Sequence, residues 1–114
     1  MEVIKKEESE FHRNSKACTT KEYSFNDKDI DLGIATIKGR YPENGFCMNK
    51  ISKELVYIDE GSGKLIFENK EIIFKKGDSV LIDKNEKYFW ETDKCKVLLI
   101  STPAWSIDQY EIVD

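Results

Sequence analysis

The sequence predicts an all-β domain built as a barrel or a sandwich. Short runs rich in β-branched and aromatic residues recur about every 8–12 residues, and turn-forming residues separate them. Helix signals are weak along the whole chain. A length of 114 residues suits one domain with a single modest core. These observations together favour strands packed around one interior.

The strand pattern is clearest in the second half of the chain. Residues 54–58 form an apolar run, which the glycine-rich stretch 60–63 punctuates. Residues 64–68 and 71–75 form two more runs, and the short Asn69-Lys70 connection between them predicts a hairpin. The remaining runs predict strands at 79–82, 87–92 and 96–101, with turns at 76–78 and 83–86.

The first half is less regular. Residues 31–38 alternate well and predict a strand, and 22–26 predict a shorter one. Residues 1–20 are charged and carry little pattern; an edge strand with a loop, or partial disorder, would account for them. The expected organisation is therefore an N-terminal edge segment, 1–20, and one barrel domain, 21–114. The tail after residue 103 is expected to pack back on the barrel, because a free tail would expose Trp105 and Tyr110.

Composition narrows the classes of function. The net charge is −4 with acidic and basic residues interspersed, so no basic face is available for nucleic acid. No apolar run approaches a membrane span, and the first residues lack the apolar core of a secretory signal. Three cysteines without paired spacing argue against a disulfide framework. The expected location is the cytoplasm, with reduced thiols and no membrane partner.

Residues 36–103 contain motifs in a recognisable order. Gly39, then Cys47 and Asn49, then Glu54, then Gly61 follow the order of a motif that opens with Gly, has two His one residue apart and a Glu, and closes with Gly. Further on, Gly77-Asp78 with Ile82 before a turn matches a second motif. In these features the chain resembles the cupins, and the resemblance implies a cupin-like jelly-roll barrel, also called a double-stranded β-helix.

The chain departs from the cupin pattern at the metal ligands. The resemblance implies three His and one Glu that bind a metal from inside the barrel. Cys47 and Asn49 stand at two of the His positions, Glu54 at the Glu position and Tyr88 at the third His position. The only histidine, His12, lies outside both motifs and is expected to be a surface residue. Because imidazole is missing, no bound metal is expected. No other cofactor is expected either.

The candidate ligand-binding residues are those that strand alternation should turn into the barrel: Cys47, Asn49, Glu54, Tyr88 and Trp90. Each has a second interpretation. Cys47 is either a small buried hydrophobe or a thiol that contacts a ligand. Asn49 is either a hydrogen-bonded polar residue in a partly wet barrel mouth or a contact for a ligand. Tyr88 and Trp90 either fill the lumen or form an aromatic wall. Glu54 is either exposed at the mouth or buried, and burial would raise its pKa.

Three hypotheses of function remain open. The first is a metal-free domain that binds a small polar molecule, uncharged or weakly acidic, in the barrel lumen. The second is a small enzyme of the isomerase, lyase or oxygenase type, with Glu54 and Tyr88 as base and acid or as atypical metal ligands. The third is a structural module with a filled barrel. The resemblance also implies a homodimer, with residues 3–4 and the outward faces of Leu55 and Tyr57 as candidates for the interface.

Overall fold

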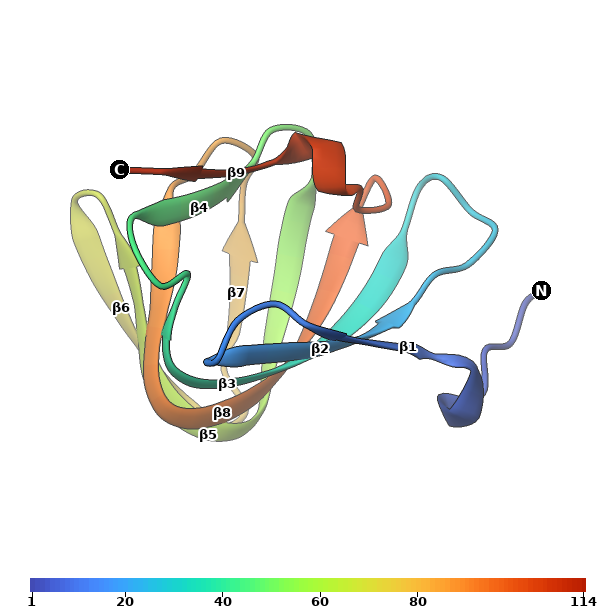
Figure 1. The fold of residues 1–114 in the computed structure, drawn as a ribbon, viewed down its shortest axis with the longest axis horizontal. Helices are drawn as coiled ribbons and strands as arrows, with labels where there is room; N and C mark the ends of the chain where they lie inside the picture. The colour runs from blue at the N-terminus through green and yellow to red at the C-terminus, as the bar shows by residue number, and fades with distance from the viewer.

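The computed structural model describes all 114 residues and consists of nine strands in one curled sheet, with two short 3-10 turns (Figure 1). The strands pair in the order β1-β2-β3-β8-β4-β9, and β5 pairs with β8, β7 and β6. No helix in the structure has the length and apolar character needed to cross a membrane. The elements are η1 (Lys6–Glu8), β1 (Glu10–Arg13), β2 (Cys18–Tyr23), β3 (Asp31–Tyr41), β4 (Phe46–Asn49), β5 (Lys53–Phe67), β6 (Lys70–Lys75), β7 (Ser79–Ile82), β8 (Tyr88–Thr102), η2 (Ile107–Gln109) and β9 (Tyr110–Val113).

Most of the expected strands are present. β7 has the predicted bounds, and β5 and β6 form the predicted hairpin, with its two turn residues at Glu68-Asn69, one position earlier than expected. β3 continues three residues beyond the predicted end at 38. The short strand expected at 22–26 lies instead at Cys18–Tyr23 as β2. Asn85 has a φ of 66°, a left-handed conformation that asparagine tolerates better than most residues.

The prediction was wrong at the two longest strands. Residues 54–58 and 64–68 were expected to be separate, as were 87–92 and 96–101, but β5 and β8 each run through 15 residues without a break. They pair with each other along their length, with register shifts between Ile58 and Glu60 and between Ser62 and Lys64. β5 and β8 therefore form one two-stranded ribbon, the β5–β8 ribbon, and the glycines between the apolar runs mark its bend. Figure 1 shows this bend as a U at the base of the barrel.

Close contact between the two strands explains the glycines at this bend. Gly61 has a φ of 84°, and a Cβ there would collide with the Lys94 carbonyl oxygen. A Cβ at Gly63 would lie 2.6 Å from Thr92 Cβ and 2.8 Å from the Glu91 carbonyl oxygen. Only residues without a side chain allow β5 to lie this close to β8 where the ribbon turns.

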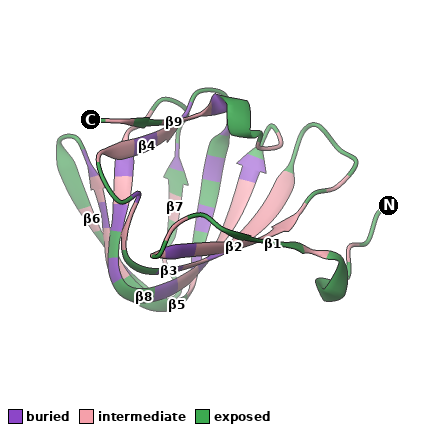
Figure 2. Ribbon diagram, in the orientation of Figure 1, coloured by how far each residue is buried: buried purple, intermediate pink, exposed green.

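The core lies inside the U. Figure 2 shows buried and exposed residues alternating along the first part of β5, as expected for a strand with one face on the interior. Val56 and Ile58 from β5 meet Val97 and Ile37 from β8 and β3, and all four side chains are fully buried. The apolar core occupies the base of the barrel, while Asn49, Glu54 and Ser101 are buried polar residues near the ends of the strands. The buried polar side chains therefore lie at the end of the barrel where the lumen opens.

Candidate functional site

The lumen holds a cavity of about 180 Å³ with an open mouth. All five residues predicted to point inward line it: Cys47, Asn49, Glu54, Tyr88 and Trp90. The exposed lining residues are Asn14 in the β1–β2 turn, Ser24 after β2 and Ile107 in η2, so the mouth lies among these three segments. Because a cavity remains beside Tyr88 and Trp90, these rings form part of its wall and do not fill it.

Glu54 and Tyr88 meet inside the lumen. The Tyr88 hydroxyl donates a hydrogen bond of 2.8 Å to Glu54 Oε1, and the two residues are 8% and 4% exposed. Glu54 lies at the start of β5 opposite Ser101, whereas Tyr88 lies at the start of β8 opposite Phe67 at the end of β5. The bend of the ribbon brings these two distant positions together. Of the two interpretations of Glu54, the structure supports the inward, buried one.

Burial raises the pKa of the Glu54 carboxyl, in the predicted direction. The nearby Asp31 carboxyl raises this pKa further, while hydrogen bonds from Tyr88 and Asn49 oppose the rise. The pKa of Tyr88 is raised well above its usual 10.0, first by burial and then by the charges of Cys47 and Glu54. Tyr88 is therefore a neutral donor at any physiological pH, and Glu54 is the group of the pair that can exchange a proton.

Asp31 is part of the site and was missed by the sequence analysis. It lies opposite Ser101 on β8, which in turn lies opposite Glu54 on β5, so the three residues form one inward row across three strands. The Asp31 carboxylate accepts a 3.0 Å hydrogen bond from the backbone N–H of Trp105. Burial raises the pKa of Asp31 against the effect of that bond. Both faces of the 31–38 pattern are apolar, so alternation alone did not show which face was inward.

The C-terminal segment closes one side of the lumen. The prediction that it packs back on the barrel is confirmed, because β9 pairs with β4. Trp105 Nε1 donates a 2.8 Å hydrogen bond to Asn49 Oδ1, and the Trp105 and Tyr110 ring centroids are 5.9 Å apart. The Tyr110 hydroxyl in turn donates to the Tyr41 hydroxyl at 3.1 Å. Three aromatic residues that the sequence analysis did not include, Tyr41, Trp105 and Tyr110, thus line the cavity.

Cys47 is a buried thiol at the wall of the cavity. Its side chain is 1% exposed, and burial raises its pKa to about 12. The thiol therefore keeps its proton at neutral pH, which removes the thiolate needed for nucleophilic attack. The other two cysteines, Cys18 and Cys95, are also free and buried.

The inward residues do not fit the metal that the cupin pattern implies. Asn49 Oδ1 already accepts the indole N–H of Trp105, and the Tyr88 hydroxyl donates to Glu54 Oε1. Glu54 is the only carboxyl at the four positions, and no imidazole is present. No chemical step is therefore assigned to a metal in the lumen.

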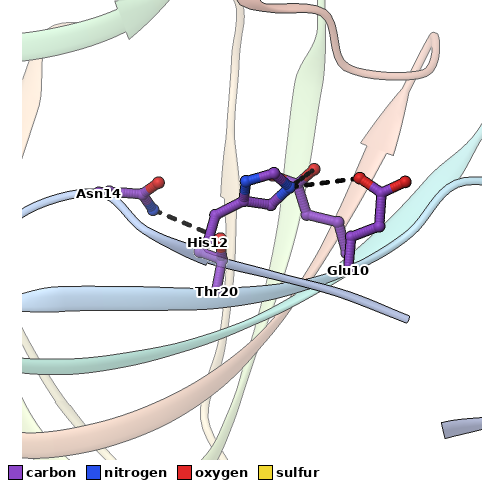
Figure 3. A network of polar contacts seen from close by, with 5 residues as sticks. Glu10, His12, Asn14 and Thr20 are labelled. Carbon is purple, nitrogen blue, oxygen red and sulfur yellow. Dashed lines mark hydrogen bonds and ion pairs between the residues drawn. The ribbon is translucent and has the colours of Figure 1, made fainter. Parts of the chain in front are cut away.

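His12 lies outside the cavity, on the outermost strand. Its Nε2 atom is 3.4 Å from Glu10 Oε2 and 3.5 Å from Glu22 Oε2, and its side chain is 45% exposed. Figure 3 shows His12 beside Glu10, with Asn14 and Thr20 farther along the same hairpin. His12 is therefore a surface residue, as predicted, and the hairpin contributes Asn14, Thr20 and Glu22 to the cavity mouth.

The chain is similar to known proteins in structure but matches none of the curated proteins in sequence. No family model matches the chain, and no curated protein matches its sequence. Among solved structures, Pac13 from Streptomyces, described as a nucleoside dehydratase, superposes with a TM-score of 0.84 at 16% identity, covering 99% of this chain and 91% of Pac13. The polyketide cyclase RemF from Streptomyces resistomycificus gives 0.76 at 12% identity, covering 100% of this chain and 86% of RemF.

KdgF from Halomonas gives a TM-score of 0.75 at 11% identity, with 95% of this chain and 97% of KdgF covered. Identities this low establish the fold and leave activity open. All three are cupin-like barrels whose length this chain nearly spans. The topology, the bent β5–β8 ribbon and these superpositions agree, and the chain is a small domain of the cupin fold.

Proposed function

We propose that this protein binds a small polar molecule in the barrel lumen without a metal. The observation that carries the proposal is the cavity itself, which has Glu54 and Tyr88 hydrogen-bonded to each other in its wall. Pockets that bind small molecules combine an apolar lining with a few polar groups that fix the orientation of the ligand. Here the lining is aromatic and aliphatic, and the polar groups lie together near Glu54, Asn49 and Asp31.

Glu54 and Tyr88 suit a ligand with a hydroxyl or carbonyl group. Tyr88 donates one hydrogen bond, and a ligand oxygen that replaced Glu54 as its acceptor would leave the carboxyl free to contact a second ligand group. A carboxyl with a raised pKa can donate a proton when neutral and accept one when charged. The same two residues therefore serve recognition and, on a suitable ligand, proton transfer.

An enzyme of the lyase type is the second candidate. Pac13 is described as a nucleoside dehydratase, and several of its structures contain uridine. Elimination of water needs a base that takes a proton from carbon and an acid that protonates the departing hydroxyl. Glu54 can take the proton from carbon and pass it to the departing hydroxyl, which then leaves as water, while the Tyr88 hydroxyl stabilises the developing charge as a hydrogen-bond donor. Uridine and related hydroxylated compounds therefore belong among the first substrates to test.

A thermal-shift screen against hydroxylated and carbonyl-containing metabolites, with uridine included, tests the proposal. A ligand of the lumen should stabilise the wild type and stabilise Glu54→Gln and Tyr88→Phe less. Glu60→Gln makes the same change as Glu54→Gln on an exposed residue and should match the wild type. Equal stabilisation of all four proteins would place the ligand elsewhere and remove the support for a lumen site.

We also propose a homodimer in the cytoplasm. Outward apolar side chains are adjacent across strands: Leu55 lies opposite Leu81 on β7 and Ile100 on β8, and Tyr57 lies opposite Leu98. Leu55, Tyr57 and Leu81 are 45%, 46% and 63% exposed. Such a contiguous patch is typical of an interface between copies. Three buried, unpaired cysteines agree with a reducing compartment.

A further inference from the structure

The charged side chains that line the lumen are all acidic. Three carboxyl groups line the cavity, those of Glu22, Asp31 and Glu54, and no lysine, arginine or histidine does. In the sequence, the Glu54 and Tyr88 pair predicted an uncharged or weakly acidic ligand. With Asp31 and Glu22 added, an anionic ligand would meet like charges, and no cationic side chain lines the cavity to offset them. We propose that the ligand of this lumen is a small organic cation, an amine or a quaternary ammonium group, which rests on the proposed small-molecule function of the same site.

The buried carboxyls are hydrogen-bonded but not ion-paired. Glu54 accepts from the Tyr88 hydroxyl, and Asp31 accepts from the Trp105 backbone N–H, both neutral donors. No salt bridge in the structure includes either carboxyl; the ion pairs are on the surface. A buried carboxylate without a cation is unfavourable, and a bound ammonium group would supply the missing charge. A neutral ligand would not supply the positive charge that the buried carboxylates lack.

Aromatic rings complete the surroundings that an ammonium group needs. Five of them line the cavity, and Trp105 and Tyr110 pack edge to face at its side. The face of an indole or phenol ring attracts a cation, most strongly for tryptophan and where water is excluded. The rings in the lining are Tyr41, Tyr88, Trp90, Trp105 and Tyr110. Carboxyls and aromatic rings in one cavity favour positive charge by two independent interactions.

The mouth adds a carboxyl group but no net negative charge. Glu22 lines the cavity, and Glu10 lies directly opposite it on β1. Arg13, Lys16 and Lys21 lie on the same hairpin, so the selection for a cation rests on the carboxyl groups inside the lumen. A cavity of about 180 Å³ admits a trimethylammonium or small amine head group, with any longer part of the ligand extending through the mouth.

The test compares three probes of similar shape and different charge: choline, its uncharged carbon analogue 3,3-dimethylbutanol, and the anion 3,3-dimethylbutanoate. Tryptophan fluorescence reports binding, because both tryptophans line the lumen. Choline should bind at least about tenfold more tightly than the alcohol, and the anion should not bind. Asp31→Asn and Glu54→Gln should each weaken choline several-fold and weaken the alcohol much less, while Glu60→Gln should behave as the wild type.

The outcomes separate the two proposals. If the alcohol or the anion binds as well as choline, or if choline and tetramethylammonium both fail to bind at 50 mM, the cation proposal is overturned. If a neutral metabolite still binds and depends on Glu54 and Tyr88, the proposed small-molecule function survives that failure. If nothing in the metabolite screen depends on these residues, the function proposal fails as well. Circular dichroism melting of each variant verifies that lost binding is not lost folding.

Discussion

Glu54 and Tyr88 are separated by 34 residues and lie at opposite ends of the β5–β8 ribbon, yet the Tyr88 hydroxyl donates a 2.8 Å hydrogen bond to Glu54 Oε1. The bend at Gly61 and Gly63 makes this contact possible, because it turns one ribbon into both sides of the barrel. The site is therefore a consequence of the curvature of two strands. Changes at the bend should reach the site even though they lie outside it.

The first prediction concerns that bend. Gly63→Ala should lower the free energy of unfolding by about 1–3 kcal/mol, because the added Cβ would overlap Thr92 and the Glu91 carbonyl oxygen. Gly33→Ala is the matched control, since a Cβ there meets only the Lys21 carbonyl oxygen at 3.8 Å, an ordinary contact. Urea unfolding of both variants measures the difference. Equal stability of the two would show that the ribbon does not need glycine at position 63.

The second prediction is a pH dependence of stability that depends on Glu54. Its pKa in the folded protein is raised above the ordinary 4.5, so the folded state holds the proton more tightly than the unfolded state. Stability is therefore lost as the pH rises from about 4.5 through the raised folded pKa. The groups that face Glu54 are Tyr88, Asp31, Asn49 and Cys47, and only Asp31 titrates in the same range, with a pKa shifted in the same direction.

Glu54→Gln removes this titration while nearly keeping the shape of the side chain. The stability of the variant relative to the wild type should therefore rise with pH between 4 and 8, as measured by thermal melts in a buffer series. Glu60→Gln, on the exposed outer face, should give a curve parallel to that of the wild type. A parallel curve for Glu54→Gln as well would mean that the Glu54 carboxyl is not desolvated in solution.

The third prediction is that the lumen holds no stoichiometric transition metal. The groups at the four cupin ligand positions are a buried thiol, an amide already hydrogen-bonded to Trp105, one carboxyl and a phenol, and none is an imidazole. Elemental analysis of the purified protein should give well under one equivalent of iron, manganese, nickel or zinc. One equivalent that disappears in Glu54→Gln or Cys47→Ser would contradict this assignment.

The fourth prediction is the homodimer. Leu55→Lys places a charge in the outward apolar patch and should convert a dimer into a monomer at tens of micromolar, as sedimentation velocity would show. Ile73→Lys makes the same change on β6 at a side chain that is 77% exposed and outside the patch, so it should remain dimeric. A monomeric wild type at this concentration would remove the proposal.

Much of the fold was predictable from the sequence because alternation and hairpin spacing are local properties. β7 and the β5–β6 hairpin follow from a few neighbouring residues, and the motif order placed Glu54 and Tyr88 inside the barrel. The continuity of β5 was not predictable, because glycines mark a turn and a bend equally well in sequence. The difference lies in the contact between Gly63 and Thr92, which is known only once the strands are paired.

The site residues that could not be predicted from the sequence have a similar explanation. Asp31 begins a strand with two apolar faces, so its inward orientation depends on the register of β3 against β8. Trp105 and Tyr110 reach the lumen through the pairing of β9 with β4, a contact between segments about sixty residues apart. Their size predicted that the tail would pack on the barrel, but its place over the lumen depends on tertiary structure.

The two indole N–H groups offer the most direct test that the lumen is the binding site. Trp105 Nε1 is hydrogen-bonded to Asn49 inside the cavity, and Trp90 lies in the cavity wall, so both report on the lumen by NMR. On titration with a ligand from the screens, both indole signals should shift and saturate together, and Glu54→Gln should need more ligand to reach the same shift. If the ligand binds while both indole signals stay fixed and the backbone amides of Leu55 and Leu81 on the outer face shift, the lumen is not the binding site.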